Sequence, residues 1–421
     1  LDVGFTDFAK NVKELYFSSY IPKALEIAEI LRNRGGEERF IWTTGSWLIY
    51  EYLEQASSKD RKRMEKAIAI GDISWHGLPF TFHSEFMDAS LFRFGLGLSQ
   101  ELDKRFGKKT ISAKMSDVPG HTRGIVPLLA EAGIRLLHVG VNISSMPPEV
   151  PLVFIWRSKD DSEIICIHQK RSHGSQIIVP AMSSGLAFGY TGDNIGPQPL
   201  EQIPNRYPPS VFQVFHGLRK KYPGIKVVAS TLNNFAKDLL ESKPELPVIT
   251  GEIGDTWIHG VGSDPTKVRR FRELCRLRNE WLENGVAKRI PKRFAKFSRS
   301  LLMIPEHTWG MDEKKHLADY RNYRARDFAS ARKKENFRKF ELSWKEQRAY
   351  LEKAISALGN TYAAERAYRR LAGIAPCCPS KKGFNIVHNK GSLFETNHFT
   401  VGFDPVNGSI IHLKNKVTRR K

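Results

Sequence analysis

The sequence predicts an α/β protein with a (β/α)7-type barrel, followed by a helical bundle and the start of a β-sandwich. Three observations support this fold class. Short strand-like runs alternate with helical patterns over residues 1–262, long helical segments fill residues 263–375, and two alternating runs joined by a turn lie within residues 376–421. At about 150 residues per domain, the 421 residues correspond to roughly three domains, in agreement with this division.

The first region predicts about seven strand-and-helix units. Its strand-like runs are followed by helical patterns, one of which begins at Ser230-Thr231 with a typical helix cap. Parallel strands in about this number close naturally into a barrel. The strand-like runs are Leu1–Phe5, Phe40–Thr44, Gly71–His76, Lys109–Lys114 continuing to Asp117, Leu136–Gly140, Glu163–His168 and Lys226–Ala229, and helical patterns cover Ser46–Ala56 and Gly124–Gly133.

The second and third regions differ from the first in their predicted secondary structure. Helical segments without strand signals run through Pro265–Asn284, Pro291–Met303, Lys314–Glu352 and Tyr362–Leu371, which predicts a helix bundle. The chain then alternates over Phe399–Phe403, turns at Asp404–Gly408 and alternates again over Ser409–Leu413, as in a β-hairpin. Because two strands are not a stable domain alone, we expect a truncated β-sandwich.

The composition excludes several classes of protein. Hydrophobic residues make up 41% and charged residues 26%, which is close to the average of globular proteins and excludes general disorder. No apolar run approaches the roughly 18 residues that a membrane helix needs, so we expect no membrane partner. Four cysteines without a C-x-x-C pair exclude a disulfide scaffold and a cysteine metal knuckle. The start has neither Met nor a signal-peptide pattern, so we expect a fragment of undetermined localisation.

The net charge of +21 is compatible with nucleic-acid binding, but its distribution favours another interpretation. The basic residues are densest over 267–353, where they lie on helical sequence among many acidic residues. This pattern is typical of solvated helix faces. We therefore expect no nucleic-acid partner, with an RNA-binding surface as the alternative.

Polar and aromatic residues gather where the predicted strands end. The carboxyl ends of barrel strands meet at one rim, which is where barrel enzymes have their active sites. An Asp before Pro-Gly is often only a turn residue, but carboxylates combined with aromatic rings are typical of a carbohydrate site, where rings stack on sugars and carboxylates carry out the chemistry. These residues are Asp2, Trp75, His76, His83, Asp117, Glu252, Asp255, Trp257 and His259.

Several of these segments resemble motifs of the class II α-mannosidases, glycoside hydrolase family 38. Leu1-Asp2-Val3-Gly4-Phe5 resembles the end of the family's His-x-Asp-x-Gly-Trp/Phe motif, and Ser116–His121 resembles its Asp-Pro-Phe-Gly-His segment. The order of barrel, helix bundle and sandwich is also that of the family. Further similar segments are Phe40-Ile41-Trp42, Lys226–Thr231, Pro305-Glu306-His307-Thr308-Trp309-Gly310 and the hairpin from Glu395 to Leu413.

The resemblance implies a zinc ion (Zn²⁺) bound by Asp2, Asp117 and His307. The His of the first motif would precede Leu1 and is not in this sequence. Thr308 also departs from the family, because in many members an Asp at this place binds sugar hydroxyls. The resemblance therefore implies a zinc-dependent glycosidase of the α-mannosidase type.

The resemblance further implies a retaining reaction by double displacement on a carbohydrate substrate. Asp117 would be the nucleophile, and Asp255, or else Glu252, would be the acid about 5–5.5 Å away. The Phe5 ring would lie under the sugar, and the ring of Trp309 or Trp257 would line one side of the sugar-binding site. For His76, His83, His121 and His259 we expect either substrate contacts or structural roles in loops.

Two alternatives remain open at this point. A metal-dependent polysaccharide deacetylase on a similar barrel would need an Asp pair at a strand end and a His-x-x-x-His pair, whereas Asp160-Asp161 lies in a polar turn. A catalytically inactive module that binds carbohydrate or nucleic acid is the second alternative. The natural glycan, its linkage and the oligomeric state do not follow from the sequence.

Overall fold

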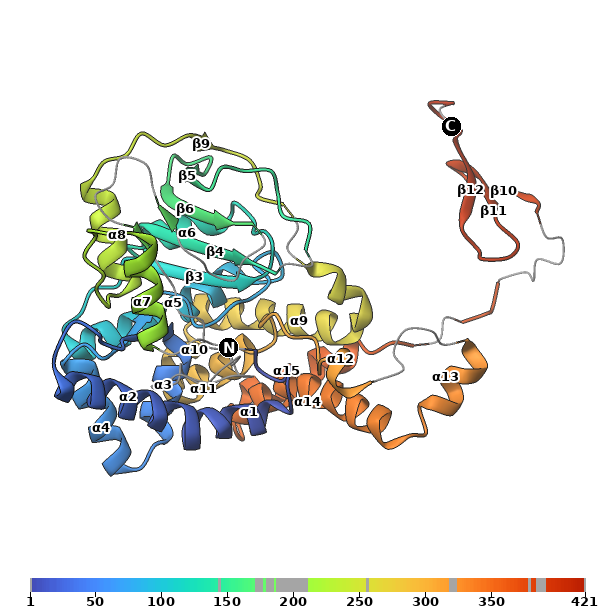
Figure 1. Ribbon diagram of the computed structural model, residues 1–421. Helices are drawn as coiled ribbons and strands as arrows, with labels where there is room; N and C mark the ends of the chain where they lie inside the picture. The colour runs from blue at the N-terminus through green and yellow to red at the C-terminus, as the bar shows by residue number, and fades with distance from the viewer. Residues whose placement is uncertain are drawn as a thin grey trace. The chain divides into compact units, whose positions relative to one another are not determined.

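The computed structural model describes residues 2–142, 145–170, 177–178, 185–186, 211–254, 257–317, 324–377, 380–383 and 391–419. The chain forms two compact units, residues 1–373 and residues 374–421 (Figure 1). The larger unit contains mixed sheets, the helices that cover them and a set of long helices. It holds all of the predicted site residues.

The first unit begins with helices and a short parallel strand pair. A turn over residues 2–5 replaces the strand predicted there, and its backbone carbonyls accept hydrogen bonds from the Gln347 side chain, in a later helix, and from the backbone N–H of Asp312, just before another. Strands β1 (Trp42–Gly45) and β2 (Ile73–His76) then pair in parallel. The helices of this part are α1 (Ala9–Leu15), the π-helix η1 (Tyr16–Tyr20), α2 (Ile21–Arg34), α3 (Ser46–Gln55), α4 (Ser58–Ala69) and α5 (Ala89–Phe106).

A five-stranded mixed sheet with the order β3-β4-β6-β5-β9 forms the centre of the first unit. Strands β3, β4 and β6 are parallel, whereas β5 runs antiparallel to β6 and parallel to β9. The strands are β3 (Ser112–Asp117), β4 (Leu136–Val141), β5 (Val153–Arg157), β6 (Glu163–Gln169) and β9 (Val248–Ile249), and helix α6 (Ile125–Glu131) connects β3 to β4.

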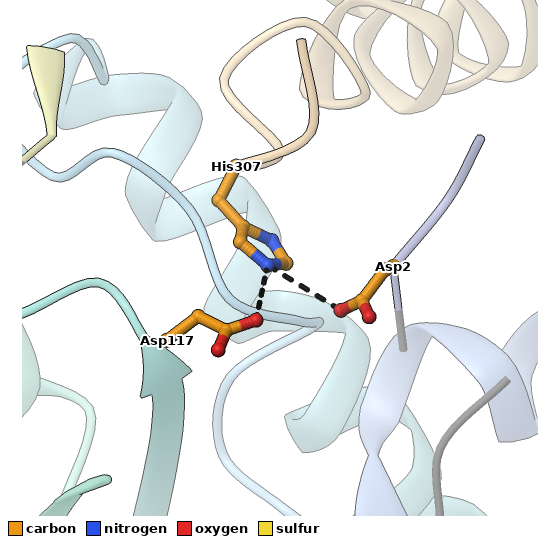
Figure 2. Close-up of side chains that lie close together, drawn as sticks. All are labelled: Asp2, Asp117 and His307. Carbon is orange, nitrogen blue, oxygen red and sulfur yellow. Dashed lines mark hydrogen bonds and ion pairs between the residues drawn. The ribbon is translucent and has the colours of Figure 1, made fainter. Parts of the chain in front are cut away.

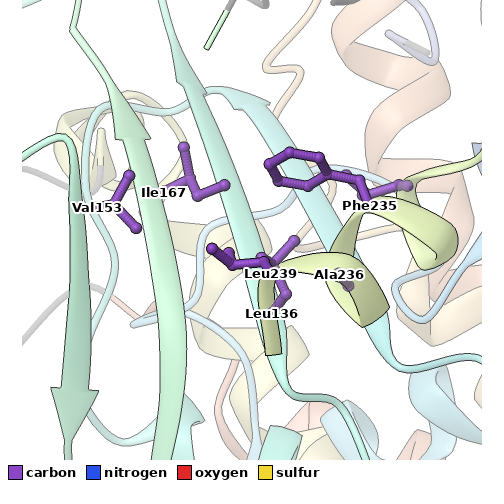
Figure 3. Packing of buried hydrophobic residues seen from close by; sticks show 7 residues of the cluster. Leu136, Val153, Ile167, Phe235, Ala236 and Leu239 are labelled. Atoms are coloured by element: carbon purple, nitrogen blue, oxygen red, sulfur yellow. The ribbon is translucent and has the colours of Figure 1, made fainter. Parts of the chain in front are cut away.

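Helix α8 (Leu232–Glu241) covers one face of this sheet. Its apolar side chains, Phe235 and Leu239 among them, pack on Leu136 and Ile167 of the strands (Figure 3). The Thr231 hydroxyl accepts a hydrogen bond from the backbone N–H of Asn234, so the predicted helix cap is confirmed. Burial of this apolar surface holds the helix against the sheet.

The strand arrangement differs in part from the sequence prediction. The strands near the predicted runs at 40–44, 71–76, 109–117, 136–140 and 163–168 are present. Within the described segment 211–254, however, Lys226–Ala229 forms no strand, and Val228 is 58% exposed. A hydrogen bond from Gly77 N to Ser112 O links the β2 and β3 edges, but the described strands do not show a closed barrel.

Long helices form the rest of the first unit. The predicted helix over Lys314–Glu352 is divided into α12, α13 and α14, and residues 318–323 lie outside the described residues. Large aromatic side chains such as Phe271, Trp281 and Phe297 fill the interior of this region. Its elements are the 3-10 helix η2 (Ile258–Ser263) and α9 (Pro265–Glu283), α10 (Val286–Arg289), α11 (Pro291–Leu302), α12 (Glu313–His316), α13 (Ala325–Ala331), α14 (Glu335–Ala357) and α15 (Tyr362–Gly373).

The second unit contains a small antiparallel sheet. Strands β11 (Phe399–Phe403) and β12 (Ile410–Asn415) form the predicted hairpin, and β10 (Leu393–Glu395) adds a third strand. In the residues that the structure describes, no helix has both the length and the apolar character to cross a membrane.

Candidate metal centre

Three acidic and imidazole side chains from distant parts of the sequence meet at one point of the first unit. His307 Nε2 lies 3.4 Å from Asp2 Oδ1 and 3.2 Å from Asp117 Oδ2, and Figure 2 shows the ring directed between the two carboxylates. One ligand atom from each residue lies within 4.8 Å of those of the other two. In the described part of the chain, this is the one cluster of three or more His, Cys, Asp or Glu groups with such spacing.

Asp117 owes its place to an unusual backbone conformation at the end of β3. Its φ is 77°, in the left-handed region that costs a residue with a Cβ roughly 1–2 kcal/mol. The neighbouring β4 end holds it, because Asn142 donates from its backbone N–H to Asp117 O at 3.0 Å and from Nδ2 to Oδ1 at 3.2 Å. Strain that is held in this way is concentrated at functional sites.

The loop after Asp117 is fixed by buried histidines. His168 Nε2 donates to Pro119 O at 2.8 Å, and His121 Nδ1 lies 3.2 Å from Ser84 Oγ, which also accepts from Thr122 N. Burial lowers the pKa of His121 to about 3, so this ring is neutral. His121 therefore has a structural place in the loop.

Asp2 is positioned by the helical region. The side-chain amide of Gln347 in α14 donates to Val3 O at 3.3 Å, and the backbone N–H of Asp312 donates to Phe5 O at 2.9 Å. Gly4 has a φ of 100°, which glycine adopts without strain. Burial alone would raise the pKa of Asp2, but the hydrogen bond with His307 and nearby positive charge lower it overall.

His307 belongs to a segment that runs beside residues 81–83. Its backbone N–H donates to Thr81 O at 3.3 Å, and His83 N donates to Pro305 O at 2.9 Å. Burial opposes the positive charge of the ring, but the Glu306, Asp117 and Asp2 carboxylates outweigh this effect and raise the pKa of His307 well above its ordinary value. The site therefore attracts positive charge.

The donor set fits a zinc ion. One imidazole nitrogen and two carboxylates are common zinc ligands, and at zinc–ligand distances of about 2.0–2.2 Å tetrahedral ligands lie about 3.4 Å apart. The separations of His307 Nε2 from the Asp2 and Asp117 oxygens, 3.4 and 3.2 Å, agree with this spacing, and all three ligand atoms lie within 4.8 Å of one another. Three protein ligands with a position left for water or substrate are typical of catalytic zinc sites.

Of the two predicted acids, the structure describes only Glu252, which is not part of the cluster of Asp2, Asp117 and His307. Glu252 is exposed and accepts a hydrogen bond from the backbone N–H of Arg123 at 2.6 Å, at the start of the segment that leads into α6. Asp255 lies outside the described residues, as does the side chain of His259. The choice between Asp255 and Glu252 as the acid therefore stays a prediction.

The aromatic residues predicted to contact substrate have varied surroundings. Phe5 and Trp257 are partly buried. Trp75 is 2% exposed, and its Nε1 donates to Asp103 Oδ1 at 3.0 Å in the packing between β2 and α5. Trp309 is partly buried, with the Lys267 ammonium 4.3 Å from its ring centre.

The two predicted histidines near β2 are both buried. His83 Nε2 lies 2.9 Å from Trp309 Nε1, an indole N–H that can only donate, and 3.1 Å from the backbone carbonyl of His307, which can only accept. The packing of these two rings supports the segment that carries His307. Burial lowers the pKa of His76 to about 3, and the neighbouring Lys114 charge adds to the shift.

A polar row on the strands was missed by sequence reasoning. Lys114 Nζ lies 2.7 Å from His138 Nδ1, and His138 Nε2 lies 2.7 Å from Gln169 Oε1, so β3, β4 and β6 each contribute one member. Burial lowers the pKa of Lys114 to about 7. The sequence signal for this row was the presence of Lys114 and His138 inside two predicted strands, where apolar residues are usual.

Comparisons with known proteins agree with this fold. Residues 261–421 match a protein family described as a domain of unknown function (DUF5054). No curated protein matches the sequence. The chain is similar to an α-mannosidase from Enterococcus faecalis V583, at 12% identity and a TM-score of 0.54, over 88% of this chain and 42% of that one.

Two further solved structures have lower TM-scores. A glycosyl hydrolase family 38 protein from Enterococcus faecalis is 12% identical, with a TM-score of 0.44 and coverage of 86% of this chain and 38% of that one. A 4-α-glucanotransferase from Thermococcus litoralis is 14% identical, with a TM-score of 0.43 and coverage of 99% and 65%. The similarity to the α-mannosidase indicates a glycoside hydrolase-type fold, and this chain spans less than half the length of that enzyme.

Proposed function

We propose that this protein is a zinc-dependent glycoside hydrolase of the family 38 α-mannosidase type. The observation that carries the proposal is the convergence of Asp2, Asp117 and His307, because the family resemblance assigns the zinc ligands to these same positions. The fold similarity to an α-mannosidase supports it independently. The proposed substrate is a carbohydrate.

The side chains of this chain suit a retaining reaction. When bound, the zinc ion would act as a Lewis acid that engages sugar hydroxyls. Asp117 attacks the anomeric carbon, the glycosidic C–O bond breaks, and a carboxylic acid from Asp255 or Glu252 gives its proton to the leaving oxygen. In the second half, the same residue takes a proton from water, whose oxygen replaces Asp117 at the anomeric carbon.

The identity of the sugar is a separate part of the proposal. Thr308, where many family members have a hydroxyl-binding Asp, is 5% exposed, and its hydroxyl donates to Glu306 Oε1 at 3.0 Å. This hydroxyl is therefore engaged within the protein. We accordingly place α-mannosides first among the substrates to be tested, and not as the sole candidates.

Hydrolysis of 4-nitrophenyl glycosides tests the proposal. The protein should release 4-nitrophenol from an α-mannoside or a related α-glycoside, lose this activity in EDTA and regain it with Zn²⁺. Asp117→Asn should remove the activity, whereas Asp160→Asn, at an exposed turn, should not. NMR of the first sugar anomer released should show retention. Equal turnover by Asp117→Asn, or turnover that survives complete metal removal, would contradict the proposal.

The deacetylase alternative lacks its expected acidic pair at the centre. Asp160 lies in the turn between β5 and β6, where its carboxylate accepts hydrogen bonds from Ser162 at 3.3 and 3.1 Å. The pair Asp160-Asp161 is thus engaged in an exposed turn and is not part of the cluster around His307. Release of acetate from an acetylated polysaccharide without glycoside cleavage would favour this alternative.

A further inference from the structure

A buried carboxylate contacts His307 on the side of the ring that faces away from the metal centre. Glu306 is 2% exposed, and its Oε1 lies 2.7 Å from His307 Nδ1. The other ring nitrogen, Nε2, faces Asp2 and Asp117. The imidazole is therefore placed between one carboxylate at Nδ1 and two at Nε2, and Glu306 is not among the three clustered ligand groups.

Glu306 is itself held by its own local segment. The backbone N–H of Thr308 donates to Glu306 Oε2 at 3.2 Å, and the Thr308 hydroxyl donates to Oε1 at 3.0 Å. The backbone of Glu306 forms a β-bridge with Phe82, which fixes the segment beside residues 81–83. Each carboxylate oxygen of Glu306 therefore accepts a hydrogen bond from Thr308 within the protein.

This arrangement determines how the imidazole can bind a metal. A neutral ring carries one proton, and the carboxylate at Nδ1 favours placing it there, which leaves the Nε2 lone pair directed to Asp2 and Asp117. Carboxylates in this position fix the orientation of metal-binding histidines and make the ring a stronger donor. The 2.7 Å contact between Nδ1 and Glu306 Oε1 is an ion pair without the alignment of a hydrogen bond, so the negative charge of the carboxylate favours the proton at Nδ1, and the Thr308 bonds keep this charge in place.

We propose that Glu306 is a positioning residue that orients His307 for a divalent metal, and that the Thr308 hydroxyl holds Glu306 for this purpose. The inference rests on the metal centre of the proposed function. It assigns to Glu306 and Thr308 a role that concerns metal affinity and not contact with the substrate. A carboxylate with only a packing role would affect stability and leave metal affinity unchanged.

Metal titration of the purified protein tests this inference. Zn²⁺ affinity is measured by calorimetry and Co²⁺ coordination by visible absorption, for the wild type and for Glu306→Gln. We expect a 10–100-fold loss of Zn²⁺ affinity and an altered Co²⁺ spectrum, as is usual when such a supporting carboxylate is removed. The metal-to-protein ratio should stay unchanged, because all three ligands remain.

Glu273→Gln is the matched control. Glu273 is also buried, at 4% exposure, but it pairs with Arg276 and Arg370 and belongs to α9. This variant should lose stability while binding Zn²⁺ as tightly as the wild type. An equal loss of Zn²⁺ affinity in both variants would mean that any buried carboxylate has this effect, and it would overturn the inference.

A second pair of variants decides the case if Glu306→Gln does not fold. Thr308→Val removes the hydroxyl that holds Glu306, whereas Thr308→Ser keeps it. We expect weaker Zn²⁺ binding in Thr308→Val and near wild-type binding in Thr308→Ser. Unchanged affinity in both Glu306→Gln and Thr308→Val would overturn the inference while leaving the metal centre intact. Absence of Zn²⁺ binding by the wild type would instead reject the metal centre itself, and the inference with it.

Discussion

His307 Nε2 lies 3.2 Å from Asp117 Oδ2, although the two residues are 190 positions apart in the sequence. Asp117 ends a strand of the central sheet, His307 follows helix α11, and Asp2 precedes the first helix. The three groups come together only when the sheet, the N-terminal turn and the helical region are folded against one another. A metal bound here would therefore stabilise the folded first unit over the unfolded chain.

The left-handed backbone conformation of Asp117 predicts that backbone strain affects stability, whereas the loss of the carboxylate affects activity. Asp117→Gly should be about 1 kcal/mol more stable than Asp117→Ala, since glycine relieves the positive φ and part of this gain is offset by unfolded-state entropy. Urea denaturation measures this difference. Both variants should lack hydrolytic activity, because neither has a carboxylate.

Asp161 provides the control for this comparison. It also has a positive φ, of 60°, but it lies in an exposed turn. Asp161→Gly should likewise exceed Asp161→Ala in stability, with activity unchanged in both. If Asp117→Gly were less stable than Asp117→Ala, the strain at the end of β3 would not be real.

Gly120 allows the loop after Asp117 to approach residues 253–254 closely. A Cβ at this position would overlap the carbonyl of Ile253, so Gly120→Ala should destabilise the protein by about 1–3 kcal/mol and reduce activity through displacement of the loop. Gly124→Ala is the control, because the Cβ there would meet only ordinary contacts at 3.6 Å or more. Thermal denaturation and glycoside hydrolysis measure the two effects, and equal behaviour of both variants would contradict the packing argument.

The buried Lys267 predicts a pH dependence of stability. Burial lowers its pKa from 10.5 to about 8, so between these values the unfolded chain binds more protons than the folded protein. The free energy of unfolding should therefore rise with pH over this interval, by about 3 kcal/mol from this group alone. Below about pH 8 the full cost of burying the charge is present, and above 10.5 it is absent.

Urea denaturation at several pH values, with Lys267→Met beside the wild type, isolates this contribution. The variant should show a weaker rise in stability above pH 8, even though it loses the cation–π contact with Trp309. Lys292→Met, at an exposed position of α11, should follow the wild type. An identical pH profile in Lys267→Met and the wild type would mean that Lys267 retains an ordinary pKa when folded.

Part of the fold and of the candidate site follows from the sequence. Local signals were sufficient for the Thr231 cap and for the hairpin of β11 and β12, because capping and turn chemistry act over a few residues. The grouping of Asp2, Asp117 and His307 followed from the order of three motifs along the chain and not from any local pattern. The glycoside hydrolase-type fold followed in the same way.

Other features depend on tertiary contacts that no local pattern encodes. Lys226–Ala229 has a strand-like composition but pairs with none of the strands that the structure describes, whereas Val153–Arg157 pairs antiparallel with β6 without having been predicted. The turn at residues 2–5 is set by Gln347 and Asp312, more than 300 residues away. The contact of Glu306 with the His307 ring does not follow from the sequence, because it depends on how the segment turns.

The basic residues of the helical region should not bind nucleic acid. Several of them form ion pairs with acidic residues, and each pair lowers the positive charge that is available to phosphates. The pairs are Arg270 with Glu352, Arg366 with Glu280, Arg370 with Glu273, and Arg348 with Asp264. Phosphate binding needs such charges gathered on one face, with a groove or an aromatic platform. A salt titration against single- and double-stranded oligonucleotides should give no binding tighter than about micromolar at physiological salt, the usual non-specific range. Tighter binding with a steep salt dependence would show that the pairs leave a continuous basic surface, and it would favour the nucleic-acid-binding alternative over the glycosidase.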